Sequence, residues 1–242
     1  MWAALDRAVA AVAGALAAMD PGDRRRPGMR PGQYRLDLVA DAAMCAVLHD
    51  AGLAVYSEES GETGPSDAAL LVVADPVDGS TNASLGLPWF ATSLCVLDAT
   101  GPLAGLVVNQ ADGTRYEARR GAGALRNGAP VAPSGCQSLA TAVVGISGLP
   151  ARSPGWAQFR ALGAASLDIC SVAAGALDVY RMAGGGTLHG WDYLAAMLVC
   201  TEAGAHVCEL DGRDLVLTDA SPRRPAVAAT PALLGELREA VI

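Results

Sequence analysis

The sequence predicts a layered α/β fold, and two patterns lead to this prediction. In the first half, two helical segments precede strand-like segments separated by turns, which indicates a mostly antiparallel sheet. In the second half, apolar strand-like and helical segments alternate, as they do in layered α/β structures. A chain of 242 residues with 52% hydrophobic residues can bury a sizeable core. We expect one large domain or two intimate halves, 1–132 and 133–242.

The first half is expected to begin with two helices. Residues 2–19 and 36–52 have helical character, and the segment between them, rich in Pro-Gly and arginine, is expected to be a loop. This loop is either a solvated basic segment or a mobile flap that approaches an anionic ligand. The expected strands cover 53–60, 69–74, 91–97, 101–110 and 113–120, and Asn127-Gly128 indicates a hairpin turn.

The second half is expected to alternate between strands and helices. Helices are expected over 155–163, 165–178 and 190–204, and a last one begins after Thr230-Pro231, an N-cap residue followed by proline. The expected strands cover 141–147, 179–182, 206–210, 215–218 and 226–229.

Composition excludes several classes of function. The formal net charge of −8 argues against a nucleic-acid-binding protein. All 17 basic residues are arginine, so lysine-dependent catalysis is excluded. The six cysteines are scattered through apolar segments, which is typical of buried thiols in a reducing compartment, and we expect a cytoplasmic protein. The apolar run 8–19 follows an aspartate and is expected to be a helix rather than a signal peptide, and no run is long enough for a membrane span.

Carboxylates gather at the ends of the expected elements. Glu58 and Glu59 end one strand, and Asp75 ends another, with Asp78 in the turn beyond it. Asp192 lies at the start of a helix. If these ends meet at one rim, the carboxylates repel one another unless a cation lies between them. Oxygen ligands without histidine or thiolate favour Mg²⁺, Mn²⁺ or Ca²⁺. Two such ions suit displacement at phosphorus with water as the nucleophile.

The residues that follow the aspartates fit the same chemistry. Pro76 is expected to stiffen the turn, and Gly79 allows the backbone to come close to a ligand. The segment from Ser80 can open a helical turn whose free N–H groups face an anion.

These motifs resemble those of the inositol monophosphatase family. "DPVDGSTN" is similar to the family signature DPxDGTxN, "SEES" to its pair of glutamates, and "GWDYLAAMLVCTEAG" to its second signature. Two further segments, 105–131 and 162–180, match in order, so the resemblance extends from about residue 35 to the end. It implies a five-layered αβαβα sandwich of the inositol monophosphatase and fructose-1,6-bisphosphatase type. It also implies Mg²⁺-dependent hydrolysis of phosphomonoesters, inhibition by lithium and a homodimer.

The resemblance also implies which residues hold the metal ions. We expect two or three Mg²⁺ ions, with Mn²⁺ as an alternative. The implied ligands are Glu58, Asp75 and the carbonyl of Val77 for the first ion, Asp75, Asp78 and Asp192 for the second, and Glu59 for a further, weaker ion. Glu58 is counted among the expected catalytic residues as well.

By the same resemblance, Ser80 orients the attacking water, at a position where the family has threonine. Asp37 is the preferred partner of this hydroxyl, with Asp41 as the competing candidate. The phosphate is expected to lie against the backbone N–H groups of Gly79, Ser80 and Thr81.

The segment before the second signature departs from the family. Members that act on inositol phosphates have a glutamate there, whereas "VYRMAGGGTLHG" has no carboxylate. The departure argues against inositol phosphate as the natural substrate. Arg181 is a candidate for an anionic ligand, with a surface role as the alternative. His189 is a candidate for a polar contact, with a structural role as the alternative.

Other substrate contacts are expected from the loop 24–35 and from the helix that begins near residue 165. Arg35 or Arg30 is expected to supply the charge that a lysine supplies near the phosphate in related enzymes. Ala165 is a further candidate for a substrate contact.

Several functions stay open at this point. The substrate is expected to be a small phosphorylated metabolite such as an inositol, sugar or aminocyclitol phosphate. Histidinol phosphate, fructose 1,6-bisphosphate and a nucleotide 3′-phosphate are alternatives. A non-catalytic protein that binds metal or phosphate is a rival, but the chain retains every carboxylate of the motifs. A structural Ca²⁺ site is disfavoured because no EF-hand-like loop is present. Neither nucleic acid nor membrane is expected as a partner.

Overall fold

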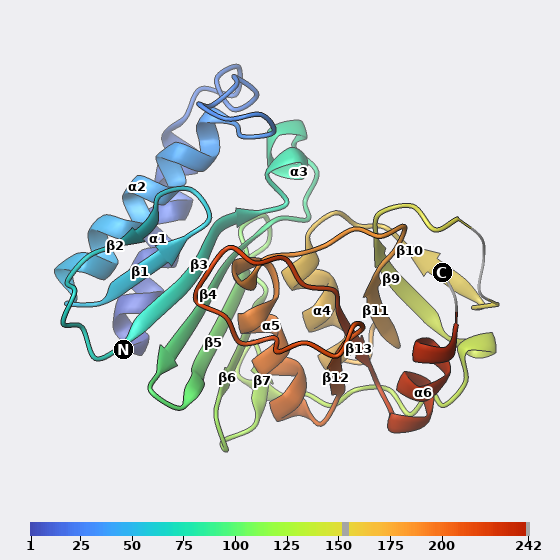
Figure 1. Cartoon of the computed structure of the whole chain (residues 1–242). Coiled ribbons are helices and arrows are strands. Elements are labelled where there is room, and N and C mark those ends of the chain that lie inside the picture. Colours follow the sequence, from blue (N-terminus) through green and yellow to red (C-terminus); the bar gives the residue numbers. More distant parts are fainter. Residues whose placement is uncertain (152–154, 241–242) are drawn as a thin grey trace.

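The protein is a sandwich of five layers, as expected from the sequence. The computed structural model describes residues 1–151 and 155–240. Figure 1 shows α1 (Trp2–Ala18) and α2 (Arg35–Asp50) on one side of a large sheet. Helices α4 (Ala165–Ala173) and α5 (Gly190–Ala203) lie between this sheet and a smaller one, and α6 (Pro231–Glu239) covers the far side.

The large sheet has eight strands in the order β2-β1-β3-β4-β5-β6-β7-β8. Strands β1 and β3 run parallel, and all the other neighbours pair antiparallel. A short helix, α3 (Ser80–Leu85), follows β3. The strands are β1 (Ala54–Ser57), β2 (Gly61–Thr63), β3 (Leu71–Asp78), β4 (Ala91–Asp98), β5 (Gly101–Asn109), β6 (Arg115–Arg119), β7 (Ala124–Arg126) and β8 (Ala129–Pro130).

The small sheet has five strands in the order β10-β9-β11-β13-β12. A short 3₁₀ helix, η1 (Leu139–Thr141), precedes it. The strands are β9 (Val143–Ser147), β10 (Gln158–Arg160), β11 (Val179–Met182), β12 (His206–Glu209) and β13 (Pro225–Ala228). The expected boundary near residue 132 falls between the two sheets, and the division into two halves stays a prediction.

Two expected elements of the second half are wrong. Residues 155–163 were expected to form a helix, but 158–160 form edge strand β10, which pairs in parallel with β9. Main-chain pairing at the sheet edge outweighs helix propensity in this short segment between two glycines. Residues 215–218 were expected to form a strand, but they form none. The Leu215 carbonyl accepts a hydrogen bond from the Tyr193 hydroxyl at 2.6 Å, so this segment packs on α5 as a loop.

Strand β3 shows why the apolar run before the aspartates is continuous. Its Val72 packs into the core beneath α1 and α2, whereas Val73 packs into the core around α4 and α5. Since alternate residues face opposite sides of a sheet, a strand covered on both faces needs apolar residues throughout. A third core lies between the small sheet and α6.

The middle layer lies unusually close to the large sheet at Gly105. A Cβ atom at this position would lie 2.6 Å from the carbonyl oxygen of Ala195 in α5. Only glycine allows this approach, which fixes the height of α5 above the sheet.

The termini of the helices agree with the sequence signals. The run 8–19 forms most of α1, which packs against α2. Thr230 caps α6, because its hydroxyl accepts a hydrogen bond from the Leu233 N–H. Within the described residues, no helix has both the length and the apolar character that crossing a bilayer requires.

Candidate active site

The parallel pairing of β1 and β3 brings the first two carboxylates together. Ser57 at the end of β1 pairs with Ala74, so the next residues, Glu58 and Asp75, lie side by side. The N–H of Glu58 donates to the carbonyl of Ala74 at 3.1 Å and continues the pairing. Parallel strands end at the same edge of a sheet, which explains why both carboxylates reach one rim.

A β-bulge in β3 sets the direction of Asp78. Asp75 pairs with Ser93 and Asp78 with Ala91, so residues 76 and 77 lie opposite a single residue of β4. In a regular strand, residues three apart point to opposite faces, and the extra residue turns Asp78 to the face that Asp75 uses. Asp78 was expected in a turn beyond the strand, and this expectation is wrong. The strand continues through Pro76, since a bulge tolerates a residue without an N–H group.

Helix α5 brings Asp192 to the same rim. The hydroxyl of Ser93 donates to the carbonyl of Trp191 at 3.1 Å, which attaches the first turn of α5 to β4. The Trp191 ring lies 5.5 Å from the ring of Tyr56 in β1. The Asp192 carboxylate accepts a hydrogen bond from the His189 N–H at 2.7 Å, so it is held at the helix start.

Three carboxylates form the centre of the site. Ligand oxygens of Glu58, Asp75 and Asp192 all lie within 4.8 Å of one another. Burial, and then the neighbouring carboxylates, raise the pKa of Glu58 to about 8 and that of Asp192 to about 7. The pKa of the fully buried Asp75 is raised well above its ordinary range for the same reasons. Among the described residues, none of these three takes part in an ion pair.

This arrangement fits a divalent cation. Carboxylates that crowd together without a positive partner are unfavourable, and a hard cation removes the repulsion. Oxygen donors are the ligands of Mg²⁺, Mn²⁺ and Ca²⁺. The residues present therefore suit such an ion by both charge and donor type. We refer to Glu58, Asp75 and Asp192 as the carboxylate cluster.

Asp78 lies beside this cluster and faces the start of α4. Its carboxylate accepts hydrogen bonds from the N–H groups of Ala165 at 3.1 Å and Ser166 at 2.7 Å, and from the Ser166 hydroxyl at 2.5 Å. Burial raises the pKa of Asp78 to about 6, although the hydrogen bonds from Ser166 and Ala165 oppose the rise. The N-terminus of a helix favours a negative charge, so Asp78 fixes α4 against the site.

The turn after β3 places a helix N-terminus beside the cluster. Gly79 has φ of 85°, and a Cβ atom there would lie 3.0 Å from the carbonyl oxygen of Gly163. Only glycine combines this conformation with this contact. As expected, Ser80 begins a helix, α3, which is fixed because the Asn82 side chain donates to the Leu162 carbonyl at 2.8 Å.

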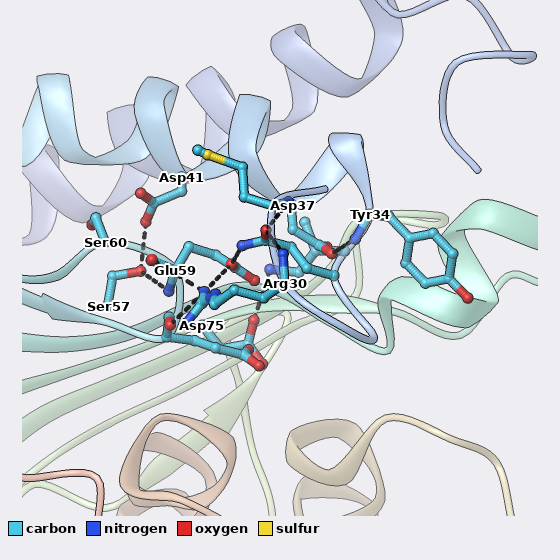
Figure 2. Close-up of polar contacts among 12 residues, drawn as sticks. Arg30, Tyr34, Asp37, Asp41, Ser57, Glu59, Ser60 and Asp75 are labelled. Atoms are coloured by element: carbon cyan, nitrogen blue, oxygen red, sulfur yellow. Dashed lines mark hydrogen bonds and ion pairs between the residues drawn. The ribbon is translucent and has the colours of Figure 1, made fainter. Parts of the chain in front are cut away.

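Asp37 and Asp41 lie in α2 but have different partners. Asp37 accepts a hydrogen bond from the Tyr34 N–H at 2.8 Å, and it lines the same cavity as Ser80. Burial raises its pKa to about 7. Asp41 instead accepts a hydrogen bond from the Ser57 hydroxyl at 2.5 Å. Figure 2 shows the two aspartates side by side on the helix, with Asp41 toward Ser57.

Two cavities open beside these residues. A cavity of about 460 Å³ is lined by residues 30–33 and by Asp37, Glu58, Glu59, Ser80, His189 and Trp191. A second cavity of about 310 Å³ is lined by Asp78, Ile146, Ser147, Gly148, Ala161, Gly163, Ala165, Leu188 and Asp192. The carboxylates therefore lie where a phosphate ester could enter.

Comparison with known proteins decides the family. The model of the inositol monophosphatase family matches residues 33–241. The chain belongs to the inositol monophosphatase family. It is therefore a phosphoric monoester hydrolase, and the metal dependence of this family agrees with the acidic cluster.

Two relatives support the same assignment, and a solved structure has the same fold. A fructose-1,6-bisphosphatase/inositol-1-monophosphatase from Archaeoglobus fulgidus is 33% identical over 215 residues, which are 85% of this chain and 82% of the relative. The Nus factor SuhB of Pasteurella multocida is 31% identical over 198 residues, which are 76% of this chain and 71% of the relative. A Pyrococcus horikoshii protein with similarities to inositol-1 monophosphatase has the same fold, with a TM-score of 0.86 at 23% identity over 97% of this chain and 95% of that one.

The structure does not bring two of the expected substrate residues to either cavity. Arg35 is exposed and forms an ion pair with Asp23 at 2.9 Å. Arg181 is only 3% exposed, and its guanidinium donates to the carbonyls of Met182 and Leu237, the second in α6. Because β11 alternates, its neighbour Tyr180 faces the core around α4 and α5, and Arg181 points the other way. Burial lowers the pKa of Arg181 to about 10.

Of three further candidate site residues, His189 and Ala165 line the cavities, whereas Thr81 lines neither of them. His189 lines the larger cavity, where its ring stacks on Trp191 with centroids 4.9 Å apart and its Nδ1 lies 3.0 Å from the Ala220 carbonyl oxygen. Ala165 lines the smaller cavity and offers its N–H to Asp78. Thr81 is exposed on α3, and its hydroxyl lies 3.4 Å from that of Tyr34.

Two residues of this site, Ser166 and Gln33, were not singled out from the sequence. Ser166, whose N–H and hydroxyl both donate to Asp78, lies in the segment 162–180 that resembles the family, but nothing in the sequence connects it with Asp78. Gln33 contacts the side chain of Glu59, and a glutamine in a Pro-Gly-rich loop carries no signal of such a role. Arg30, the alternative to Arg35 as the positive charge near the phosphate, lines the larger cavity and forms an ion pair with Glu59 at 2.6 Å, and its role toward the phosphate stays a prediction.

Proposed function

We propose that this protein hydrolyses a small phosphate monoester with Mg²⁺ and with water as the nucleophile. The observation that carries the proposal is the carboxylate cluster of Glu58, Asp75 and Asp192, which has no ion-pair partner in the described chain. Ser80 and Asp37 lie beside it on the wall of one cavity. A cation site next to a hydroxyl and a helix N-terminus suits phosphoryl transfer to water.

The metal ligands follow from the cluster and from the family motif. We assign the first ion to Glu58, Asp75 and the carbonyl of Val77, and the second to Asp75, Asp78 and Asp192. Asp75 would be the shared ligand, and the bulge supports this role because the Val77 N–H holds one Asp75 oxygen at 2.9 Å. When bound, Mg²⁺ or Mn²⁺ ions would polarise water and neutralise the charge of the phosphate.

The protein itself orients the nucleophile and the phosphate. The Ser80 hydroxyl is the group that positions the attacking water, and Asp37 is its proposed partner. Asp37, with a pKa raised to about 7, can accept a proton near neutral pH. The phosphate binds against the N–H groups of Gly79, Ser80 and Thr81 at the start of α3, because the first N–H groups of a helix have no partner within the helix and Gly79 provides no side-chain cap.

The smaller cavity is the proposed place of the alcohol part of the substrate. Apart from Asp78, Asp192 and Ser147, its lining consists of glycine, alanine, isoleucine and leucine, and the Ser147 hydroxyl already accepts a hydrogen bond from Tyr180 at 2.9 Å. Such walls offer few hydrogen-bond partners to the hydroxyl groups of a polyol. They support a sugar or aminocyclitol phosphate with few hydroxyls facing this side over an inositol phosphate.

Other substrates and a non-catalytic role define the alternatives. The name of the Archaeoglobus fulgidus relative favours testing fructose 1,6-bisphosphate, and histidinol phosphate and nucleotide 3′-phosphates complete the set. The name of the Pasteurella multocida relative is a reason to test for a role outside catalysis. We expect a cytoplasmic homodimer that is sensitive to lithium and that binds neither nucleic acid nor membrane.

Phosphate release across these substrates, with Mg²⁺ and with EDTA, tests the proposal. Turnover of at least one ester should require Mg²⁺ and should decrease with lithium. A protein that binds metal in calorimetry but releases no phosphate from any ester would favour the non-catalytic alternative. Turnover that persists in EDTA would contradict the metal assignment.

A further inference from the structure

The loop before α2 is a closed turn that the protein builds around Gln33. The N–H of Gly28 donates to the Gln33 carbonyl at 2.8 Å, and the N–H of Gln33 donates to the Arg30 carbonyl at 3.1 Å. The Gln33 side-chain oxygen accepts from the N–H groups of Met29 at 2.7 Å and Arg30 at 3.2 Å. These hydrogen bonds close residues 28–33 into a compact turn.

This turn presents two donors to one oxygen of Glu59. The guanidinium of Arg30 reaches Oε2 of Glu59 at 2.6 Å, and the Gln33 amide donates to the same oxygen. The same Arg30 nitrogen donates to the carbonyls of Glu58 and Glu59 at 3.2 and 3.1 Å. Figure 2 shows Arg30 and Glu59 facing each other beneath α2.

Glu59 differs in this respect from the carboxylate cluster. Its side chain is 6% exposed, yet it has a positive partner, whereas Glu58, Asp75 and Asp192 have none among the described ion pairs. The geometric group of metal-ligating oxygens contains Glu58 but not its neighbour Glu59. A guanidinium and a divalent cation on the same carboxylate oxygen would repel each other.

We propose that Arg30 is the built-in counter-cation of Glu59, so that the site takes two divalent ions and Glu59 holds no third one. The inference rests on the proposed function, because it assumes that the carboxylate cluster binds metal. Gln33 acts as a positioning residue, since it shapes the turn and shares the oxygen that Arg30 contacts. The arginine thereby takes the place of the weaker ion that the motif implies.

The number of Mn²⁺ ions bound at saturation, measured by equilibrium dialysis and by electron paramagnetic resonance, tests the proposal. The unmodified protein should bind two ions. Arg30→Met removes the charge and retains much of the apolar stem, so it should bind a third, weaker ion. Arg30→Lys keeps a cation near Glu59 and should bind two. The double variant with Arg30→Met and Glu59→Gln should return to two ions, since the freed carboxylate is then absent.

Arg35→Met is the matched control. Arg35 belongs to the same arginine-rich segment, but its partner is Asp23, outside both cavities, so the variant should still bind two ions. Melting curves in EDTA establish that each variant is folded. Three ions in the unmodified protein, or two in a folded Arg30→Met variant, would overturn the role of Arg30. Fewer than two ions in the unmodified protein would instead reject the two-metal site itself.

Discussion

Two groups of buried carboxylates in this protein have opposite surroundings. The first group consists of Glu209 at the end of β12, whose side chain is only 1% exposed. It accepts hydrogen bonds from the Arg213 guanidinium at 2.7 Å and from the N–H groups of Asp211 and Arg224 at 2.7 and 2.9 Å. Burial by itself raises the pKa of Glu209, but these hydrogen bonds prevail and lower it to about 2.

The second group, the carboxylate cluster, has no cationic partner among the described ion pairs, and its hydrogen bonds come from the N–H groups of Val77 to Asp75 and of His189 to Asp192. Glu58, Asp75 and Asp192 lie against one another, and burial raises the pKa of each. The difference indicates that Glu209 has a structural role, whereas the carboxylate cluster has a functional one. A satisfied carboxylate such as Glu209 supports the fold around it. An unsatisfied cluster costs stability unless a ligand compensates it, and this is the usual condition of a functional site.

The largest effect should come from Asp75→Asn, because Asp75 is the ligand shared by both proposed ions. Loss of a metal removes several kcal/mol of transition-state stabilisation, so we expect kcat/KM to fall by about 10³-fold or more. Without metal, the same variant should melt at a higher temperature, since one buried, repelling carboxylate is removed. Steady-state kinetics with Mg²⁺ and melting in EDTA measure the two effects. Full activity in this variant would reject the shared-ligand assignment.

Ser80 should have the next largest effect. Ser80→Ala removes the hydroxyl that is proposed to position the water, and we expect kcat to fall by about 10²-fold with metal binding unchanged. Ser80→Thr restores the hydroxyl and is the matched control, which should remain active. If Ser80→Ala kept its kcat, Asp37 and Ser80 would have no part in positioning the nucleophile.

The location of these residues shows what a sequence can predict about such a site. Glu58 follows the end of β1 and Asp192 lies in the first turn of α5, so their approach to one rim could be predicted. Asp75 was expected to end its strand, but it lies within β3, just beyond the residues that pair with β1. The direction of Asp78 could not be predicted, because it depends on a bulge that exists only in the pairing of β3 with β4.

Long-range contacts were the least visible in the sequence. Glu59 and Arg30 lie 29 positions apart, and no periodicity or spacing connects them. Arg181 was misjudged because an arginine in a short strand does not reveal which face it occupies until the neighbours of that strand are known. The helix expected over 155–163 was wrong for a similar reason, since edge pairing decided its middle residues.

Glu209→Gln tests the carboxylate that has an arginine partner, and the variant should change the stability of the protein but not its activity. The variant weakens the hydrogen bonds from Arg213 and from the backbone, and we expect a loss of about 1–3 kcal/mol in the free energy of unfolding. Activity at a temperature well below melting should be unchanged, because Glu209 lines neither cavity. Urea denaturation measures the loss. A drop in kcat without a loss of stability would show that the two groups are coupled.

The smallest effect is a shift of melting temperature with pH, and its sign differs between the two groups. In the metal-free protein the pKa of Glu58 is raised from 4.5 to about 8 and that of Asp192 from 3.8 to about 7. The folded state then binds more protons than the unfolded state between these values, so stability decreases as the pH rises from about 4 to about 8. The pKa of Glu209 is lowered from 4.5 to about 2, so its contribution is lost as the pH falls through this range.

In EDTA, the melting temperature should therefore have a maximum at moderately acidic pH. It should be lower by a few degrees toward about pH 3 and toward about pH 9. Saturating Mg²⁺ should raise the melting temperature most at the alkaline end, because bound ions replace the protons that the carboxylate cluster otherwise needs. Glu209→Gln should flatten the acid side, and Asp75→Asn should flatten the alkaline side. If Mg²⁺ raised the melting temperature equally at every pH, the metal would not be neutralising the repulsion within the carboxylate cluster.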